Sequence, residues 1–430
     1  MSDKMTAAPV LIKGAKVWLD GEFRCTDLRV ADGVVNAIAP DIMPEEDDMI
    51  VDGKGRHLIP GLVDLHVHFR EPGFSYKETI AAGSRAAAKG GFTTVCTMPN
   101  LKPAPDSVEN LKKQLDSISD DAQIEVLPFA TITRQRLGHE CVDYKALLPY
   151  VAGFSDDGTG VQDADVMRRS MEGIAEVDGL LAAHCEVESL LNKGYIHDGE
   201  YARAHGHRGI CSESEWGEVK RDIELAAATG CRLHICHVST KESVELVREA
   251  KRKGLKVTCE TGPHYLAFTD ADLQEDGRFK MNPPIRSGAD REALRRGIAD
   301  GTVDVVATDH APHSAEEKAK GLEKSAMGVV GLETSLPAVY TYMVEPGHIS
   351  LGKLVEVMAD NPRRILGRDP EIKEGSRADL TLVDFSREWT VDPESFLTLG
   401  RATPFNGCKL KGEIMLTLFG GAPVFSHPEL

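Results

Sequence analysis

The feature that most constrains the fold is a series of short apolar segments in the middle of the chain, separated by segments with helical periodicity. Strands that alternate with helices are typical of parallel sheets. Eight such strands in about 300 residues is the number that a (β/α)₈ barrel needs. The pattern therefore predicts an α/β fold with a TIM-like barrel over residues 61–365. The eight expected strands span residues 62–68, 93–98, 124–131, 151–155, 179–184, 233–238, 256–260 and 303–308.

Helical segments lie between these strands. The clearest one runs from Ser239 to Lys253, where Ser239 and Glu242 have the spacing of a capping box and Gly254 provides a stop. A second helix is expected over about residues 290–298.

The two ends of the chain have a different pattern. Residues 10–19 alternate and are followed by Asp20-Gly21, which is typical of a hairpin turn. Similar strand-like pieces occur at residues 27–30, 34–38, 378–384 and 412–418. We therefore expect a small β-sandwich domain formed by residues 1–60 and 366–430 together.

Composition narrows the class of protein further. The formal net charge of -18 argues against a nucleic-acid-binding or anionic-membrane-binding protein. No apolar run is long enough for a membrane span, and Met1-Ser2-Asp3-Lys4 lacks the pattern of a signal peptide. Nine cysteines without a CxxC motif indicate reduced thiols, so we expect a cytoplasmic protein.

Possible metal ligands occur at the ends of five expected strands. Active sites of barrels lie at the carboxyl ends of their strands. His66 and His68 alternate on the first strand, so their side chains point the same way, and Arg70 follows them. The other candidates are Asp156 and Asp157, His184, His237 and Asp309. Their convergence predicts a metal centre, and the neighbouring arginine indicates an anionic substrate.

Some alternatives stay open at this point. A bridge between two metals needs an anionic group, and the fourth strand has no lysine that could be carboxylated. Asp157 is the preferred bridge, but the sequence does not separate it from Asp156. His234 would face away from His237 on a strand, so we expect it to pack in the interior, as we do His57 and His264.

Imidazole and carboxylate ligands suit a catalytic zinc site. Zinc would convert bound water to hydroxide, which serves as the nucleophile. Asp309 could bind metal and also take and give a proton.

Six motifs together resemble those of class I dihydroorotases, in the amidohydrolase superfamily. The motifs are residues 64–73 (DLHVHFREPG), 97–100 (TMPN), 154–158 (FSDDG), 234–239 (HICHVS), 281–286 (MNPPIR) and 307–313 (ATDHAPH). The resemblance implies zinc-dependent, reversible cyclisation of N-carbamoyl-L-aspartate to L-dihydroorotate with release of water, a step of pyrimidine biosynthesis.

The resemblance also implies roles for individual residues. One zinc would be held by His66, His68 and Asp309, a second by His184 and His237, and Asp157 would bridge them. A single zinc is the alternative. Asp309 would be the catalytic proton shuttle. The expected substrate contacts are His68, Arg70, Asn100, Asn282, His313, Met327 and Gly328.

Partners and rival functions complete the sequence-based hypotheses. We expect a small-molecule substrate, a homodimer and possible association with aspartate transcarbamoylase. The rival enzymes are hydantoinases, dihydropyrimidinases and allantoinases, which usually carry a carboxylated lysine on the fourth strand. A non-catalytic scaffold would have lost metal ligands, whereas all are present. Residues 315–327 are either an exposed helix or loop, or a flap over the site.

Overall fold

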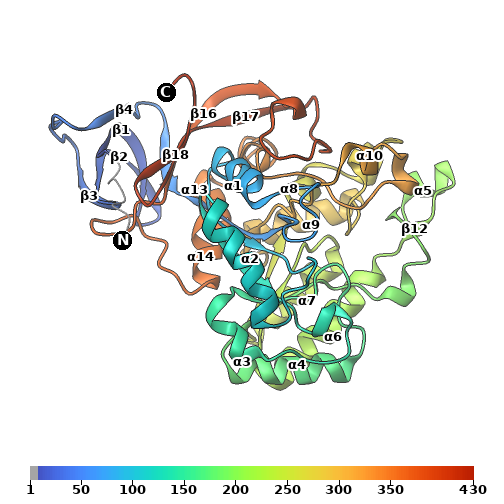
Figure 1. Ribbon diagram of the computed structural model, residues 1–430. Coiled ribbons are helices and arrows are strands. Elements are labelled where there is room, and N and C mark those ends of the chain that lie inside the picture. The colour runs from blue at the N-terminus through green and yellow to red at the C-terminus, as the bar shows by residue number, and fades with distance from the viewer. Residues whose placement is uncertain (1–7) are drawn as a thin grey trace.

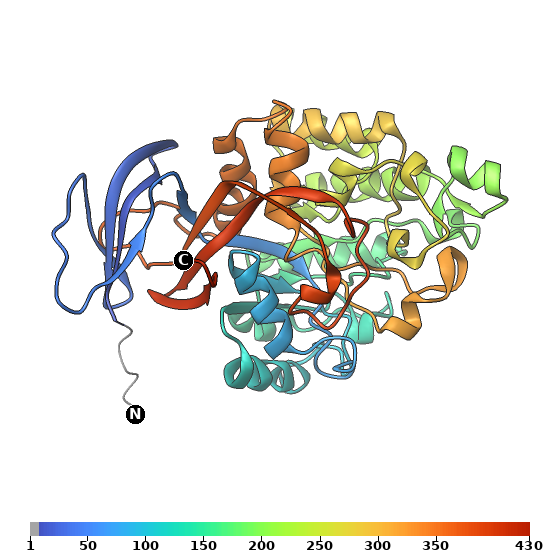
Figure 2. The same ribbon diagram turned by 90° about the horizontal axis from the view of Figure 1, so that it is seen from above.

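Eight parallel strands form a barrel in the computed structural model, which describes residues 8–430 (Figures 1 and 2). A bridge between Val67 and His310 joins the first strand to the segment after the last one, and His68 N donates to His310 O over 2.8 Å. Each strand overlaps one of the expected segments, so the predicted barrel is confirmed. In sheet order the strands are β6 (Leu62–Val67), β7 (Phe92–Thr97), β8 (Glu125–Ala130), β9 (Gly153–Phe154), β10 (Leu180–Ala183), β13 (Arg232–Ile235), β14 (Val257–Thr261) and β15 (Val305–Val306).

Alternation along these strands separates two apolar cores. On β13, Leu233 and Ile235 belong to the large core shared with the surrounding helices. Leu180, Ala182 and Cys236 belong to a smaller cluster inside the barrel. His234 lies between the first two residues on β13, so its side chain shares the interior face with Cys236.

Helices surround the barrel in both views (Figures 1 and 2). They are α1 (Ile80–Lys89), α2 (Val108–Asp121), α3 (Tyr144–Leu147), α4 (Ala164–Glu176), α5 (Glu200–His205), α6 (Glu213–Thr229), α7 (Lys241–Arg252), α8 (Pro263–Ala267), α9 (Gly288–Ala299), α10 (Ala315–Lys318), α11 (Gly321–Lys324), α12 (Ser335–Val339), α13 (Leu351–Val355) and α14 (Asn361–Ile365). Residues 340–344 and 356–360 are π-helical turns that follow α12 and α13. A short pair, β11 (Ile196–His197) and β12 (Gly209–Ile210), flanks α5.

Both helices expected from the sequence are present as α7 and α9, but the start of α7 differs from the prediction. Its N-cap is Thr240, whose hydroxyl accepts a hydrogen bond from Ser243 N. The Ser239 hydroxyl instead donates to the buried carboxylate of Glu215. The predicted capping box at Ser239 is therefore wrong, because a tertiary contact uses that hydroxyl.

The two chain ends meet in one eight-stranded sheet beside the barrel. The N-terminal strand β5 pairs antiparallel with the C-terminal strand β16, so that Leu58 faces Leu382. Asp20 and Gly21 both have positive φ, as the hairpin turn requires. The strands are β1 (Val10–Leu19), β2 (Glu22–Ala31), β3 (Val34–Ala39), β4 (Met49–Asp52), β5 (His57–Pro60), β16 (Leu380–Thr390), β17 (Lys409–Phe419) and β18 (Ala422–Ser426).

This sheet agrees with the prediction of a β-rich unit made from both ends. The domain limits expected from the sequence, 1–60 and 366–430 for this unit and 61–365 for the barrel, remain predictions. Residues 1–7, which include the segment Met1-Ser2-Asp3-Lys4, lie outside the described residues.

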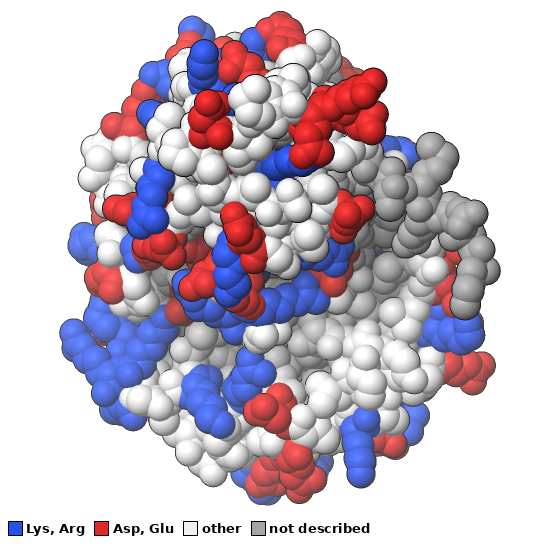
Figure 3. Space-filling model, turned by 90° about the vertical axis from the view of Figure 1, so that its left-hand side faces the viewer, with Lys and Arg blue, Asp and Glu red and all other residues white. Residues whose placement is uncertain are grey.

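Surface charge is mixed on the face shown in Figure 3, where acidic and basic side chains are interspersed. Within residues 8–430, no helix is long and apolar enough to cross a membrane. All nine cysteines are free, and Cys96, Cys185, Cys231, Cys236 and Cys259 are buried.

Candidate metal centre and substrate pocket

The histidines and aspartates at the strand ends come together at the carboxyl end of the barrel. Asp157 lies at the middle of this cluster. Its Oδ1 is 3.3 Å from His66 Nε2, 3.5 Å from His184 Nδ1 and 3.6 Å from His237 Nε2. Its Oδ2 is 3.6 Å from His68 Nε2. Asp157 therefore belongs to two groups of possible metal ligands, one with each pair of histidines.

Asp309 completes the cluster from the segment after β15. Its Oδ1 is 3.1 Å from His68 Nε2 and 3.5 Å from His66 Nε2. The side chain is 9% exposed, so it faces the cavity rather than bulk solvent. The predicted ligands therefore form one connected cluster, in which Asp157 lies near all four histidines and Asp309 lies near His66 and His68.

The cluster has donor atoms suited to a metal ion. His66 Nε2, Asp157 Oδ1 and His184 Nε2 are buried without a hydrogen-bond partner within the described residues. Buried polar atoms are rarely left unpaired, and each such atom costs stability. His184 Nδ1 and His237 Nε2 face each other at 2.9 Å. Imidazole nitrogens and carboxylate oxygens are the ligands that zinc prefers, so the residues fit such an ion.

Charges within the cluster shift its pKa values. Burial alone would raise the pKa of Asp157, but the neighbouring positive charge of His66 and the close imidazole groups of His184 and His237 lower it well below its usual range. The pKa of Asp309 is also lowered, because the histidines outweigh the effect of burial. Both groups are therefore carboxylates at neutral pH, as metal ligands must be.

Asp156 has a different environment from its neighbour. Its Oδ1 accepts a 2.8 Å hydrogen bond from Ile132 N, and both of its oxygens lie 3.2 Å from Thr133 N. It fastens the loop after β8 and does not join the histidine cluster. Geometry therefore distinguishes the two adjacent aspartates that the sequence left open.

A buried carboxylate that the sequence analysis missed orients His66. Glu260, on β14, accepts from His66 Nδ1 at 2.7 Å through Oε1 and lies 3.1 Å from His234 Nε2 through Oε2. His234 Nδ1 in turn lies 2.8 Å from Thr258 Oγ1. With Nδ1 engaged, His66 presents Nε2 to the cluster. The interior position expected for His234 is observed, but it is part of a hydrogen-bond chain rather than apolar packing.

Asp64 supports the same region from β6. Its carboxylate accepts hydrogen bonds from His66 N at 3.0 Å and from Thr308 N at 3.1 Å. Burial raises its pKa to about 7. Asp64 therefore holds the first and last strands of the barrel together beneath the metal ligands.

All the expected substrate-contacting residues line one cavity of about 210 Å³ at this end of the barrel. Arg70 is its main cation. Its side chain is buried, and burial lowers its pKa to about 10, so it stays charged at neutral pH. No carboxylate oxygen of residues 8–430 lies within 4.0 Å of its nitrogens. A buried guanidinium without an acid partner fits an anionic ligand.

Contacts with neighbouring groups orient two polar side chains of the cavity, those of Asn100 and His313. Asn100 Oδ1 lies 2.8 Å from His68 Nδ1, and the Asn100 amide nitrogen, at the edge of the cavity, makes a long 3.5 Å contact with Asp157 Oδ2. His313 Nε2 lies 2.8 Å from Met327 O, and its Nδ1 lies 3.1 Å from Lys77 Nζ. Burial and nearby cations lower the pKa of His313 to about 3, so the ring is neutral.

Asn282 lies on another side of the cavity. Its amide nitrogen donates to Glu186 Oε1 at 2.9 Å, while its own Oδ1 is buried and has no hydrogen-bond partner among residues 8–430. Glu186 stands two residues after His184 but was not among the site residues predicted from the sequence. The free oxygen of Asn282 is available to accept a hydrogen bond from a ligand.

Position 328 has no room for a side chain, so glycine is needed there. Its φ is 132°, and a Cβ there would lie 2.7 Å from Ala311 O and 3.0 Å from His313 Nε2. The backbone of residues 327–328 can therefore approach a ligand closely. Residues 315–327 include α10 and α11, and Lys318 Nζ holds them by donating to Gly328 O at 2.7 Å.

A second arginine missed by the sequence analysis stands beside the cavity. Arg136 has a φ of 58°, and its buried Nε has no hydrogen-bond partner in the part of the chain that the structure describes. Its Nη2 lies 3.8 Å from the point that a Cβ on Gly158 would occupy. In the sequence, the only indication for Arg136 was its position in the segment that follows a barrel strand.

A (β/α)₈ barrel with this ligand cluster at its carboxyl end defines a metal-dependent hydrolase of the amidohydrolase class. Comparison with solved structures agrees. L-Hydantoinase (dihydropyrimidinase) from Arthrobacter aurescens superposes with a TM-score of 0.87 at 27% identity, covering 97% of this chain and 96% of that one. Dihydropyrimidinase from Brevibacillus agri shares the fold, with a TM-score of 0.85 at 22% identity and coverage of 97% and 95%.

Sequence comparison identifies the family. Residues 55–243 match the family described as dihydro-orotase-like. The chain is 46% identical to a dihydroorotase of Bacillus cytotoxicus over 409 residues, which is 94% of this chain and 95% of the relative. It is 45% identical to a dihydroorotase of a Geobacillus species over 97% of this chain and 99% of the relative. The chain belongs to the dihydroorotase family, and it is a cyclic amide hydrolase with a metal cofactor and a small-molecule substrate.

Proposed function

We propose that this enzyme catalyses the reversible cyclisation of N-carbamoyl-L-aspartate to L-dihydroorotate in pyrimidine biosynthesis. One observation carries the proposal. A buried arginine without an acid partner, Arg70, lines the same cavity as the ligand cluster centred on Asp157. This combination suits a cyclic amide that also bears a free carboxylate.

The metal cofactor is zinc, with two ions per subunit. Asp157 would bridge them, since it shares a ligand group with each pair of histidines. His66, His68 and Asp309 would complete one set, and His184 and His237 the other. Bound zinc would polarise the amide carbonyl oxygen and make water easier to ionise.

Asp309 is the proton shuttle of the reaction. In the hydrolytic direction its carboxylate takes a proton from the attacking water and gives it to the ring nitrogen as the carbon–nitrogen bond breaks. Ring closure uses the same carboxylate in reverse. The hydrogen bond to His68 and the enclosed position of Asp309 fix the carboxylate for this transfer.

Arg70 binds the substrate carboxylate, because a guanidinium can form two parallel hydrogen bonds to it. The Asn100 amide nitrogen contributes a further donor. His313 stays neutral and shares its Nε2 proton between Met327 O and the substrate.

The ring amide groups contact the other walls of the cavity. The free Oδ1 of Asn282 accepts from a ring or ureido N–H, and the backbone at residues 327–328 closes the pocket over the ring. Substrate contact by His68 would follow from its position between Asn100 and Asp309.

Hydantoinases and allantoinases are the rival enzymes, and substrate preference distinguishes them from the proposed activity. The fourth strand carries no lysine, and Lys145 is exposed on α3, away from the cluster. Zinc-loaded protein should hydrolyse dihydroorotate at least about 100-fold more efficiently than hydantoin or allantoin, as about 2.7 kcal/mol of discrimination would give. Comparable kcat/KM values for dihydroorotate and allantoin would contradict the proposed substrate. No turnover of any cyclic amide would instead favour a non-catalytic scaffold.

We further propose a cytoplasmic homodimer that can associate with aspartate transcarbamoylase. The free cysteines support a reducing compartment, and the partners rest on the family resemblance. Sedimentation velocity of the full chain, alone and with the transcarbamoylase, tests both assemblies.

A further inference from the structure

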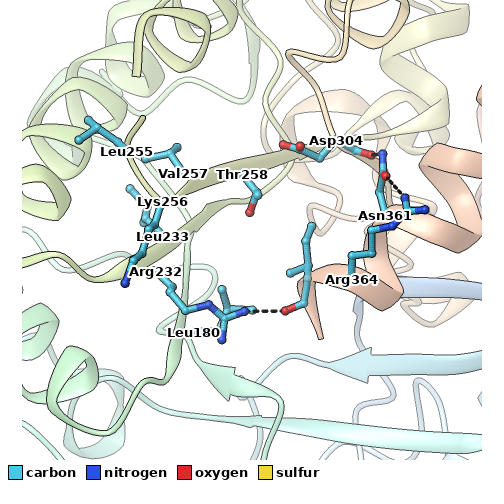
Figure 4. Close-up of a pocket in the computed structure, with 11 residues that line it drawn as sticks. Leu180, Arg232, Leu233, Leu255, Lys256, Val257, Thr258, Asp304, Asn361 and Arg364 are labelled. Atoms are coloured by element: carbon cyan, nitrogen blue, oxygen red, sulfur yellow. Dashed lines mark hydrogen bonds between the residues drawn. The ribbon is translucent and has the colours of Figure 1, made fainter. Parts of the chain in front are cut away.

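A second cavity, of about 540 Å³, opens at the amino ends of the barrel strands (Figure 4). Leu180 and Arg232 begin β10 and β13, and Asp304 directly precedes β15. Asn361 and Arg364, from α14, form the facing wall. The candidate active site lies at the opposite ends of the same strands, so the two cavities are separate.

Three cations line this cavity without an acid partner. They are Arg232, Lys256 and Arg364, and no carboxylate oxygen of the described residues 8–430 lies within 4.0 Å of their side-chain nitrogens. Arg232 Nη2 donates to Ile365 O at 2.7 Å, and Arg364 Nη1 donates to Asn361 Oδ1 at 2.9 Å. Each guanidinium therefore keeps other N–H groups for a ligand.

The one carboxylate in the lining is already neutralised. Asp304 Oδ1 lies 2.7 Å from Lys251 Nζ, and its Oδ2 accepts from Cys259 N at 2.9 Å. The cavity is consequently a local region of positive charge in a chain with a net charge of -18.

Part of the cavity lining is apolar. Leu180, Leu233 and Val257 are at most 5% exposed and line the cavity together with the cations. A volume of this size lies within the range of about 300–1,000 Å³ that small-molecule sites occupy. A lining that combines apolar side chains with cations suits an organic anion better than an inorganic one.

We propose that this amino-end cavity binds a small organic phosphate. Arg232 and Lys256, at the starts of neighbouring strands, hold the phosphate oxygens, Arg364 adds positive charge from the facing wall, and the organic part lies against the leucine and valine side chains. Guanidinium groups match phosphate through paired N–H donors, and lysine adds a point charge. The site is independent of the reaction proposed for the carboxyl end.

Calorimetric titration of the full, zinc-loaded chain with adenosine 5′-monophosphate tests the proposal. Adenosine and inorganic phosphate, titrated at the same ionic strength, separate the two halves of the ligand. We expect saturable 1:1 binding of the nucleotide, with each half at least about tenfold weaker. Lack of nucleotide binding at millimolar concentration, or equally tight binding of inorganic phosphate, would overturn the proposal.

A pair of double variants locates the binding. Lys256→Glu/Arg364→Glu reverses two charges in the cavity, and Arg252→Glu/Lys253→Glu reverses two exposed charges at the end of α7, outside the lining. The first should weaken nucleotide binding at least about tenfold, and the second by less than about twofold. Equal weakening in both, or none in the first, would contradict a built site.

Two further variants keep the result interpretable. Lys256→Ala removes one exposed cation that has no ion pair among the described residues, and it should weaken binding even if the double variant unfolds. Arg70→Met should leave nucleotide binding unchanged. A loss of nucleotide binding in Arg70→Met would place the ligand in the catalytic cavity and overturn the proposal.

Discussion

The two ends of the barrel differ in how their polar side chains are held. At the carboxyl end, His237 and Asp309 have φ values of 34° and 47°, and Arg70 has a φ of 58°. Buried atoms without partners, such as His66 Nε2, also gather there. At the amino end, Arg232 is hydrogen-bonded to the backbone and the cations reach solvent. Strain and unpaired atoms are costly, so their concentration at one end indicates where chemistry requires them.

The same substitution at opposite ends of one strand should separate these roles most strongly. Asp309→Asn should lower kcat for dihydroorotate about 10²–10⁴-fold, because it removes the proton acceptor. Asp304→Asn, before the start of β15, should keep kcat within about twofold, because within residues 8–430 its carboxylate contacts Lys251 and a backbone N–H and no residue of the active site. Steady-state kinetics measures both, and equal losses would show that the two ends do not differ as described.

Arginines at the two ends provide the next contrast. Arg70→Met should raise KM strongly. The loss of transition-state stabilisation, calculated from the fall in kcat/KM, should be about 2–5 kcal/mol, because the substrate carboxylate loses its buried partner. Arg232→Met should leave KM unchanged, although it removes a hydrogen bond to Ile365 O. Full kcat/KM in Arg70→Met would refute the assigned carboxylate site.

Glu260 tests whether the hydrogen-bond chain inside the barrel supports the metal ligands. Glu260→Gln should weaken zinc binding about 10–100-fold, because His66 loses the carboxylate that orients it and increases its basicity. Competition with a chromophoric chelator measures this affinity without relying on activity. Glu249→Gln, exposed on α7, is the matched control and should bind zinc as the unchanged protein does.

Thr258→Val should produce the smallest effect. It removes the hydroxyl beside His234 Nδ1, at the end of the hydrogen-bond chain that lies farthest from His66. We expect a loss of about 1 kcal/mol of unfolding free energy and a smaller change in zinc affinity than for Glu260→Gln. A larger change in zinc affinity than for Glu260→Gln would show that orientation of His66 begins at Thr258.

The barrel was predictable because its eight strands are short apolar segments divided by clear helical patterns. Strand alternation also predicted that His66 and His68 share a direction, and their rings lie 5.3 Å apart. The start of α7 was less predictable, because Glu215 lies 24 residues before Ser239 and no local pattern shows their contact.

The rest of the site depends on long-range geometry. Asp156 and Asp157 are neighbours in sequence, and only the path of the chain after β9 turns one toward Thr133 and the other toward the histidines. His234 and Glu260 are 26 residues apart in the sequence and come together on neighbouring strands. The amino-end cavity has no motif, because its lining is drawn from residues 180–365.

Anomalous diffraction at the zinc edge, from crystals of the zinc-loaded protein, tests the central assignment most directly. The account predicts two peaks, each about 2.0–2.2 Å from an oxygen of Asp157. One peak should be held by His66 and His68 and the other by His184 and His237. Peaks that lie away from Asp157, or a centre in which Asp157 contacts no metal, would contradict the account.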